Sequence, residues 1–203
     1  MKNKLILITG GAGFIGSHTV LELLRCNFKV IVIDNLSNCT KKNINKIKSI
    51  KKDKVIFHKV DLLKKNQIEE IFKKYKSIST VIHFAALKSV PESIMMPDKY
   101  YQNNVVGTLN LLSAMNNNGC KNLIFSSSAS IYSDESLPPF KETDKLGYTN
   151  PYSHTKLIIE DMLRNYITTD KDLNICILRY FNPAGADTLG LIGEENLDQT
   201  NLF

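Results

Sequence analysis

The chain has 203 residues, of which 43% are hydrophobic and 23% are charged. This composition is typical of a globular protein with a substantial core and excludes disordered, collagen-like and coiled-coil chains, while apolar runs such as residues 5–8 are too short to span a bilayer. The net charge of +6 is mostly lysine spread over residues 41–76. Because no aromatic residues interleave there in a stacking pattern, we expect solvated faces and neither a nucleic-acid nor a membrane partner.

Short apolar strands and helices alternate along the chain. In chain order, the pattern predicts a strand at 4–8, a helix at 15–26, a strand at 30–33, a helix at 43–52, a strand at 55–60, a helix at 67–74, a strand at 80–84, a helix at 101–117, a strand at 123–126, a helix at 151–166 and a strand at 174–178. Asn118-Gly119 favours a C-cap, and Pro151 favours a first helical turn. Continuous apolar strands separated by helices predict an α/β fold with a doubly wound parallel sheet, the Rossmann arrangement.

The N-terminus and the cysteines both indicate the cytoplasm. The apolar run after residues 1–4 ends at the glycines of residues 9–11, so no secretory leader is expected. The cysteines show neither CxxC nor metal-ligand spacing; they are Cys26, Cys39, Cys120 and Cys176. We therefore expect a cytoplasmic protein without a metal site.

A glycine-rich turn joins the first predicted strand to the first predicted helix. It contains Gly11-x-Gly13-x-x-Gly16 and also Gly10-x-x-Gly13-x-x-Gly16. Glycine lets the backbone turn sharply and approach a pyrophosphate closely, and the helix N-terminus offers unpaired N–H groups to that anion. A plain glycine turn is the alternative, but the strand–turn–helix context favours a dinucleotide site.

Two acidic residues follow the next two predicted strands. Asp34 ends the second strand, where a carboxylate can bond both ribose hydroxyls and would repel a 2′-phosphate, which favours NAD over NADP. Asp61 closes the third strand and is a candidate adenine contact, with a helix N-cap as the alternative.

A tyrosine and a lysine lie four residues apart in the last predicted helix. Tyr152 and Lys156 share one helix face, and the ammonium, together with the positive ring of an oxidised nicotinamide, would lower the pKa of the phenol. Tyr152 can then act as a general base on a sugar hydroxyl. Alone, such a pair is usually part of an ordinary helix surface. Here Ser128, the last of three consecutive serines at 126–128, lies at the end of the fifth predicted strand, at the edge where α/β sheets bind ligands. A role of these serines in a turn or a helix cap is the alternative.

Seven segments together resemble the extended short-chain dehydrogenase/reductase family, and within it the epimerases of UDP-sugars. They are residues 9–18, 34–38, 83–88, 100–107, 126–132, 151–156 and 179–186, and the resemblance covers essentially the whole chain. It implies tightly bound NAD, a UDP-hexose substrate and the interconversion of UDP-glucose and UDP-galactose. In such an enzyme, the tyrosine takes the proton of the 4-hydroxyl, C4 gives hydride to NAD, the keto sugar rotates, and the hydride returns to its other face.

The resemblance also implies roles for individual residues. The residues expected at the catalytic centre are Ser128, Tyr152 and Lys156. The residues expected to contact NAD are Gly10, Gly13, Phe14, Ile15, Gly16, Asp34, Asn35, Leu36, Ser37, Asn38, Cys39, Asp61, Leu62, Phe84, Ala85, Ala86, Leu87, Lys88, Asn103, Tyr152, Lys156 and Phe181. The residues expected to contact substrate are Lys88, Ser128, Tyr152 and Asn182; without the resemblance, Phe181 would be read as core and Asn182 as part of a turn.

Two adjacent residues distinguish this chain from the related dehydratases. Those enzymes carry an Asp-Glu pair after the catalytic hydroxyl residue, whereas this chain has Ala129-Ser130, so elimination of water lacks its acid and base. Epimerases of other UDP-sugars stay open as alternatives, because their discrimination is expected mostly beyond residue 203.

The chain also departs from the family pattern. Pro91, Ser133 and Ser153 stand where glycine is common, so we expect strained turns around the two serines. Residue 203 falls where the family enters its smaller C-terminal domain. We therefore expect residues 1–180 to form the NAD-binding domain and residues 181–203 the start of a truncated substrate-binding region. A homodimer through helices 101–117 and 151–166 is expected at full length, and a catalytically silent NAD-binding remnant or regulatory module is the alternative to an epimerase.

Overall fold

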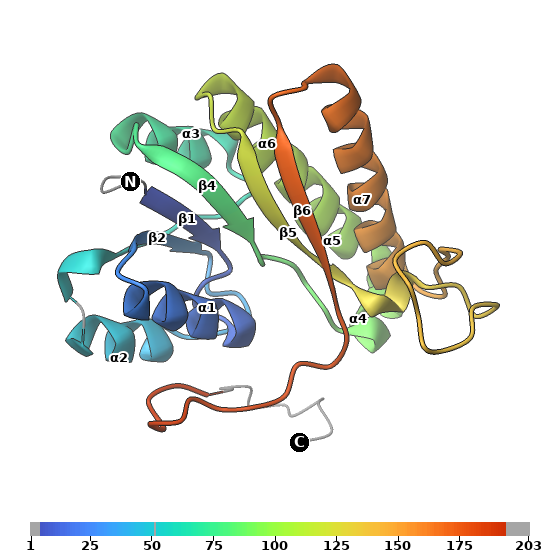
Figure 1. Ribbon diagram of the computed structural model, residues 1–203, viewed down its shortest axis with the longest axis horizontal. Helices are drawn as coiled ribbons and strands as arrows, with labels where there is room; N and C mark the ends of the chain where they lie inside the picture. The colour runs from blue at the N-terminus through green and yellow to red at the C-terminus, as the bar shows by residue number, and fades with distance from the viewer. Residues whose placement is uncertain (1–4, 51, 194–203) are drawn as a thin grey trace.

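Six parallel strands form one sheet at the centre of the protein. In the computed structural model, which describes residues 5–50 and 52–193, the strand order is β3-β2-β1-β4-β5-β6 and every pairing is parallel (Figure 1). The strands are β1 (Leu5–Thr9), β2 (Lys29–Asp34), β3 (Val55–Lys59), β4 (Ile78–His83), β5 (Asn122–Ser128) and β6 (Asn174–Tyr180). The direction of winding reverses between β1 and β4, and α/β sheets bind ligands beside the carboxyl ends of such strands.

Helices cover both faces of this sheet. They are α1 (Phe14–Arg25), α2 (Lys42–Ile50), α3 (Lys65–Lys74), α4 (Val90–Met95), α5 (Pro97–Tyr100), α6 (Gly107–Asn117) and α7 (Pro151–Thr169), together with the π-helical segment η2 (Tyr101–Val106) and the 3₁₀ turns η1 (Lys52–Lys54) and η3 (Ala129–Ile131). The predicted doubly wound parallel sheet is therefore confirmed. No helix within residues 5–50 and 52–193 has the length and apolar character needed to cross a membrane.

Each face of the sheet has its own buried core. On one face, α3, α6 and α7 pack around Leu7 and Leu111. On the other, α1 and α2 pack around Ile8, Val20 and Ile47 (Figure 1). Because successive strand residues point to opposite faces, the neighbours Leu7 and Ile8 each enter a different core, and full burial of each side chain contributes roughly 1.5–3 kcal/mol. This two-sided burial explains why the strands read as continuous apolar runs.

The helical predictions differ from the structure mainly between β4 and β5. The single helix predicted at 101–117 is a longer composite of α5, η2 and α6, and α4 was not predicted. Helix α4 has only six residues, too few for a hydrophobic period, but Ser89 caps it by accepting from the Glu92 amide at 3.3 Å. The C-cap predicted at Asn118-Gly119 is confirmed, with Gly119 at φ +68°.

The expected strain at the two serines is wrong. Among the described residues other than glycine, only Asn27 and Leu36 have positive φ. Ser153 instead forms a capping box with Asn150, whose side chain accepts from the Ser153 amide at 2.9 Å. A serine at this position therefore stabilises the start of α7.

The segment after β6 returns toward the first helices. Asp187 forms an ion pair with Arg25 of α1 at 2.6 Å, and Ile192 is buried against α1 and α2. Of the region predicted at 181–203, residues 194–203 lie outside the described residues, as do Lys4 of the first predicted strand and Lys51 of the predicted helix 43–52.

Candidate active site

A cavity of about 390 Å³ lies at the carboxyl edge of the sheet, within the usual size of cofactor pockets. Leu36 does not line it and packs instead against the core around α1 and α2. Every other residue predicted to contact cofactor or substrate lines the cavity: Gly10, Gly13, Phe14, Ile15, Gly16, Asp34, Asn35, Ser37, Asn38, Cys39, Asp61, Leu62, Phe84, Ala85, Ala86, Leu87, Lys88, Asn103, Ser128, Tyr152, Lys156, Phe181 and Asn182.

Ten further residues line the cavity without having been predicted. They are Ala12, Ile33, Asn43, Val60, Val90, Ser126, Ser127, Ser130, Tyr180 and Pro183. Most adjoin predicted residues in the sequence, so widening each motif by one or two positions would have found them. Asn43 is different, because it enters the wall from α2, whose polar sequence carries no binding signal.

The glycines of the turn have distinct structural reasons. Gly10 lies at φ +67°, and a Cβ there would stand 2.6 Å from the Ala85 nitrogen. A Cβ on Gly16 would stand 2.2 Å from the Gly10 carbonyl oxygen, so this glycine lets α1 pack on the turn. A Cβ on Gly13 would meet only the Gly10 oxygen, at 3.5 Å. Gly13 therefore leaves space beside the N-terminus of α1, where no side chain caps the helix, and this arrangement fits a pyrophosphate.

Asp34 stands at the carboxyl end of β2, as predicted. One carboxylate oxygen accepts from the Ala12 amide at 3.1 Å, and the other accepts from the Leu36 amide at 2.9 Å. The oxygen bonded to Leu36 also accepts from the Cys39 thiol at 3.6 Å. Because a carboxylate oxygen has two lone pairs, the oxygen bonded to Ala12 can still accept from a ribose hydroxyl. Asp34 thus orders the glycine turn and the following loop while it faces the cavity. The hydrogen bond from the Leu36 amide to Asp34 holds Leu36 in its positive-φ conformation, at φ +61°.

Asp61 lines the cavity but does not cap a helix. Its carboxylate accepts from the Leu63 amide at 2.9 Å, whereas the N-cap of α3 is Lys64. The alternative reading of Asp61 as an N-cap is therefore wrong, and its contact with adenine stays a prediction.

The opposite end of the cavity holds the predicted catalytic residues. The Lys156 ammonium is buried, donates to the Ser126 carbonyl oxygen at 2.7 Å and lies 6.0 Å from the centre of the Tyr152 ring. Burial lowers the pKa of Lys156 to about 8, and the negative charge of Glu160 acts in the opposite direction. Ser128 bonds to Ser130 at 2.9 Å and lies close enough to Tyr152 for a hydrogen bond.

The pKa of Tyr152 differs from the sequence-based expectation. In the chain by itself, burial raises the pKa of this phenol, and the hydrogen bond to Ser128 only partly offsets that rise. The expected fall depended on a second positive charge from the nicotinamide as well as on Lys156. The protein alone therefore holds Tyr152 as a neutral phenol at neutral pH.

A directed chain of buried hydrogen bonds lies beneath the cavity. The Ala85 amide donates to the Thr9 hydroxyl at 3.2 Å, and that hydroxyl is hydrogen-bonded to His83 Nδ1 at 2.6 Å. On the other side of the ring, the Thr108 hydroxyl donates its only proton to the Asn104 carbonyl oxygen. His83 must therefore be the donor in its 2.9 Å bond from Nε2 to Thr108. Because burial lowers the pKa of His83 to about 3, the ring is neutral at neutral pH and carries its proton on Nε2, so Thr9 donates to Nδ1.

Asn104 extends this chain to α7, the helix that carries Tyr152 and Lys156. Its side-chain amide donates to the Leu87 carbonyl oxygen at 3.1 Å and to the Thr155 hydroxyl at 3.0 Å, and its oxygen accepts from the Leu87 amide at 2.8 Å. The π-helical turns of η2 carry this residue, and such turns are frequent at functional sites. The glycine turn, the cavity floor and α7 are thereby connected through buried polar groups that sequence patterns did not indicate.

His83 should make the protein sensitive to mild acid. Burial lowers its pKa from 6.5 to about 3, so the folded state binds this proton less tightly than the unfolded chain. The stability provided by neutral His83 is complete above pH 6.5 and is lost as the pH falls toward 3. Between pH 7.5 and pH 5, we expect the free energy of unfolding to fall by about 2 kcal/mol on this account.

Urea unfolding at the two pH values measures this loss. The variant His83→Gln should be less stable at pH 7.5 but should show a smaller fall toward pH 5. His58→Gln is the matched control, because burial also lowers the pKa of His58 but that ring is only partly buried. An equal fall in His83→Gln and the unaltered protein would assign the acid sensitivity to other groups.

Within the described residues, no three His, Cys, Asp or Glu side chains gather where they could hold a metal ion.

Comparison with known proteins places these features in a family context. The family described as the NAD dependent epimerase/dehydratase family matches residues 6–196. UDP-glucose 4-epimerase of Dictyostelium discoideum is 46% identical over 196 residues, which are 97% of this chain and 57% of that protein. The bifunctional protein GAL10 of Kluyveromyces lactis is 47% identical over 98% of this chain and 30% of that protein.

Solved structures agree with the sequence comparison. A UDP-glucose 4-epimerase of Stenotrophomonas maltophila, with bound NAD and formylated UDP-arabinopyranose, superposes with a TM-score of 0.93 at 38% identity, over 98% of this chain and 59% of that one. The enzyme of Bifidobacterium longum, in complex with NAD+ and UDP, gives a TM-score of 0.92 at 40% identity, over 96% of this chain and 58% of that one. The chain thus spans a little more than half the length of the three UDP-glucose 4-epimerases and 30% of the bifunctional protein.

Proposed function

Because the chain belongs to the NAD dependent epimerase/dehydratase family, we propose that the protein binds NAD and interconverts UDP-glucose and UDP-galactose. One observation carries the proposal. A single cavity has the glycine turn and Asp34 at one end and Ser128, Tyr152 and Lys156 at the other. The relatives named UDP-glucose 4-epimerase, and the neighbours whose structures contain NAD, support the choice of cofactor and substrate.

The turn and Asp34 supply the binding end of the site. Gly13 leaves room for the pyrophosphate, the first amides of α1 are free to donate to it, and the Asp34 carboxylate accepts from the ribose hydroxyls. A 2′-phosphate would be repelled by Asp34, which favours NAD over NADP. When bound, NAD accepts a hydride from the sugar and gives it back.

Tyr152 is the residue that moves the proton. Its phenolate accepts the proton of the sugar 4-hydroxyl, and the resulting phenol later returns it, while Ser128 donates a hydrogen bond to the sugar oxygen. Lys156 provides the positive charge that makes the phenolate accessible despite the burial that raises the pKa of Tyr152. Holding Lys156 against the Ser126 carbonyl fixes that charge beside the ring.

The residues after Ser128 favour epimerisation over dehydration. Elimination of water needs a carboxyl acid and a carboxylate base beside the sugar, and Ala129 and Ser130 provide neither. With no acid–base pair there, the same constellation supports oxidation and reduction at one carbon.

We divide the chain into two functional regions at residue 180. We assign residues up to 180 to cofactor binding and catalysis, and residues from Phe181 onward to the start of the substrate-binding region, since Phe181, Asn182 and Pro183 line the cavity directly after the last strand. A homodimer at full length and a cytoplasmic location complete the proposal.

Measuring bound cofactor and turnover on the same sample tests the function. The purified protein should release NAD on denaturation and should convert UDP-galactose to UDP-glucose without added cofactor. Bound NAD without turnover would favour the silent NAD-binding module, whereas the absence of any bound dinucleotide would overturn both readings.

A further inference from the structure

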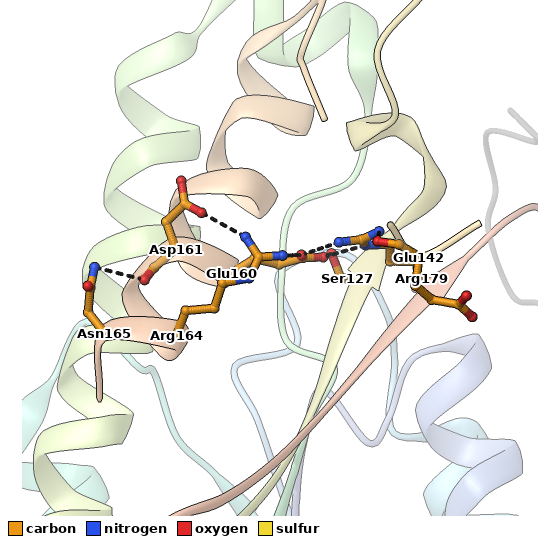
Figure 2. A network of polar contacts seen from close by, with 7 residues as sticks. All are labelled: Ser127, Glu142, Glu160, Asp161, Arg164, Asn165 and Arg179. Carbon is orange, nitrogen blue, oxygen red and sulfur yellow. Dashed lines mark hydrogen bonds and ion pairs between the residues drawn. The ribbon is translucent and has the colours of Figure 1, made fainter. Parts of the chain in front are cut away.

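A completely buried carboxylate stands one helical turn after Lys156. Glu160 of α7 accepts from the Ser127 hydroxyl at 2.6 Å and from Arg179 of β6 through two bonds, Nε at 3.1 Å and Nη2 at 2.8 Å (Figure 2). Such a paired guanidinium–carboxylate contact fixes orientation as well as charge. Glu160 thereby ties α7 to the ends of β5 and β6, next to the catalytic residues.

Arg179 carries this connection into the loop that precedes α7. Its Nη1 donates to the Glu142 carbonyl oxygen at 3.1 Å (Figure 2), and its guanidinium lies 5.1 Å from the centre of the Tyr132 ring. The Arg179 side chain is 11% exposed, so a cation–π contact there is stronger than at an open surface. One face of Tyr132 is thus fixed by a charge that Glu160 holds in place.

Three stacked rings continue from Arg179 to the mouth of the cavity. The Tyr132 and Phe140 rings lie 4.7 Å apart at an interplanar angle of 6°, and the Phe140 and Phe181 rings lie 6.2 Å apart at 19°. Phe181 lines the cavity, yet it is 64% exposed. Burial in a core therefore does not fix its position, and the stack on Phe140 becomes the contact that orients it.

We propose that Glu160, Arg179, Tyr132 and Phe140 form a strut that positions Phe181 against the site. These four act as positioning residues, because their contacts reach the cavity through Phe181 and Ser127. The effect on catalysis rests on the proposed function, but the strut itself does not.

The strut also restrains the long loop that carries Phe140, the residue against which Phe181 stacks. Residues 132–150 contain no helix or strand; their backbone is held by bonds from Ser133 to the Lys145 carbonyl at 3.0 Å and from Gly147 to the Ile131 carbonyl at 2.8 Å. Removing the strut should let this loop open more often, which raises hydrogen exchange at the Ser133 and Gly147 amides. It should also misplace Phe181, and small misplacements reduce turnover strongly.

Two substitutions interrupt the strut while preserving positive charge or apolar character. Arg179→Lys keeps a cation beside Glu160 but loses the planar guanidinium over Tyr132, and Phe140→Leu keeps an apolar side chain but loses the stack. Arg164→Lys is the matched control, because Arg164 also bonds Glu160, at 2.9 Å, yet its side chain is 48% exposed and the partners seen for it lie within α7. Glu160→Gln is avoided, because it would leave buried Arg179 without a counter-charge and could prevent folding.

Hydrogen exchange of the purified chain decides the proposal without relying on activity. In Arg179→Lys and Phe140→Leu, exchange at the Ser133 and Gly147 amides should accelerate by about tenfold or more, while it stays unchanged in Arg164→Lys and returns to normal in Phe140→Tyr. Unchanged exchange in the first two variants would overturn the strut, whether or not the protein is an epimerase.

Turnover then tests the functional consequence. In an active protein, both variants should lower kcat by about tenfold or more while the dissociation constant for NAD changes little, and Phe140→Tyr should restore the rate. If the unaltered protein does not epimerise, the proposed function fails and the exchange result still stands. Accelerated exchange with an unchanged kcat would show that the strut holds the loop but does not position Phe181 for catalysis.

Discussion

Tyr152→Phe should lower the rate of epimerisation by about 10²–10⁴-fold, the usual contribution of a general acid–base group, while NAD stays bound. The substitution removes only the phenolic oxygen, which is the atom that we propose moves the proton of the 4-hydroxyl. It leaves the ring beside Lys156 and the wall of the cavity in place. The measurements are turnover of UDP-galactose and the amount of NAD released from denatured protein.

Tyr166→Phe is the control for this change. Tyr166 lies on the same helix, three to four turns after Tyr152. It is partly buried against the core around Leu7 and Leu111 and does not line the cavity. Its variant should turn over normally. An unchanged rate in Tyr152→Phe would refute the assignment of this residue as the base, and loss of NAD in the same variant would mean that the phenol serves binding instead.

Gly16→Ala should damage both the fold and the cofactor site. The added methyl would stand 2.2 Å from the Gly10 carbonyl oxygen and 2.7 Å from the Gly11 Cα. These are backbone atoms that cannot rotate away, so α1 or the turn must shift. We expect the free energy of unfolding to fall by about 3 kcal/mol or more and NAD binding to be lost, as measured by urea unfolding and by calorimetric titration.

Gly13→Ala separates the two effects. Its methyl would be 3.5 Å from the Gly10 oxygen, an ordinary contact, and would otherwise occupy open space beside the cavity. This variant should unfold like the unaltered protein but bind NAD more weakly, because the pyrophosphate needs that space. Equal stability of Gly16→Ala and Gly13→Ala would contradict the packing role assigned to Gly16.

The sequence was most informative where function and fold use the same residues. The glycine turn, Asp34 and the Tyr152–Lys156 pair could be placed from spacing alone, because each needs a fixed position relative to a strand or helix end. The assignment of Phe181 to the cavity came from the resemblance and not from spacing, since an aromatic residue after a strand is equally typical of a core.

The contacts that connect distant segments could not be predicted. Nothing in the sequence of α7 shows that Glu160 pairs with Arg179 of β6, because surface helices often carry Glu at this spacing. The same holds for His83, whose two partners lie 74 and 25 residues away. The direction of the Tyr152 pKa shift was unpredictable for a related reason, since burial depends on the whole fold and outweighs the hydrogen bond to Ser128.

The position of β1 between β2 and β4 governs when the cofactor site assembles during folding. Thr9 and His83 are 74 residues apart in sequence, and the glycine turn meets Ala85 only after β4 has paired with β1. Closing such a long loop is only slightly more costly than closing a short one, but parallel pairing of distant strands is slow. A growing chain that has not reached β4 therefore carries the complete glycine motif without its binding geometry, so cofactor can stabilise the protein only late in folding.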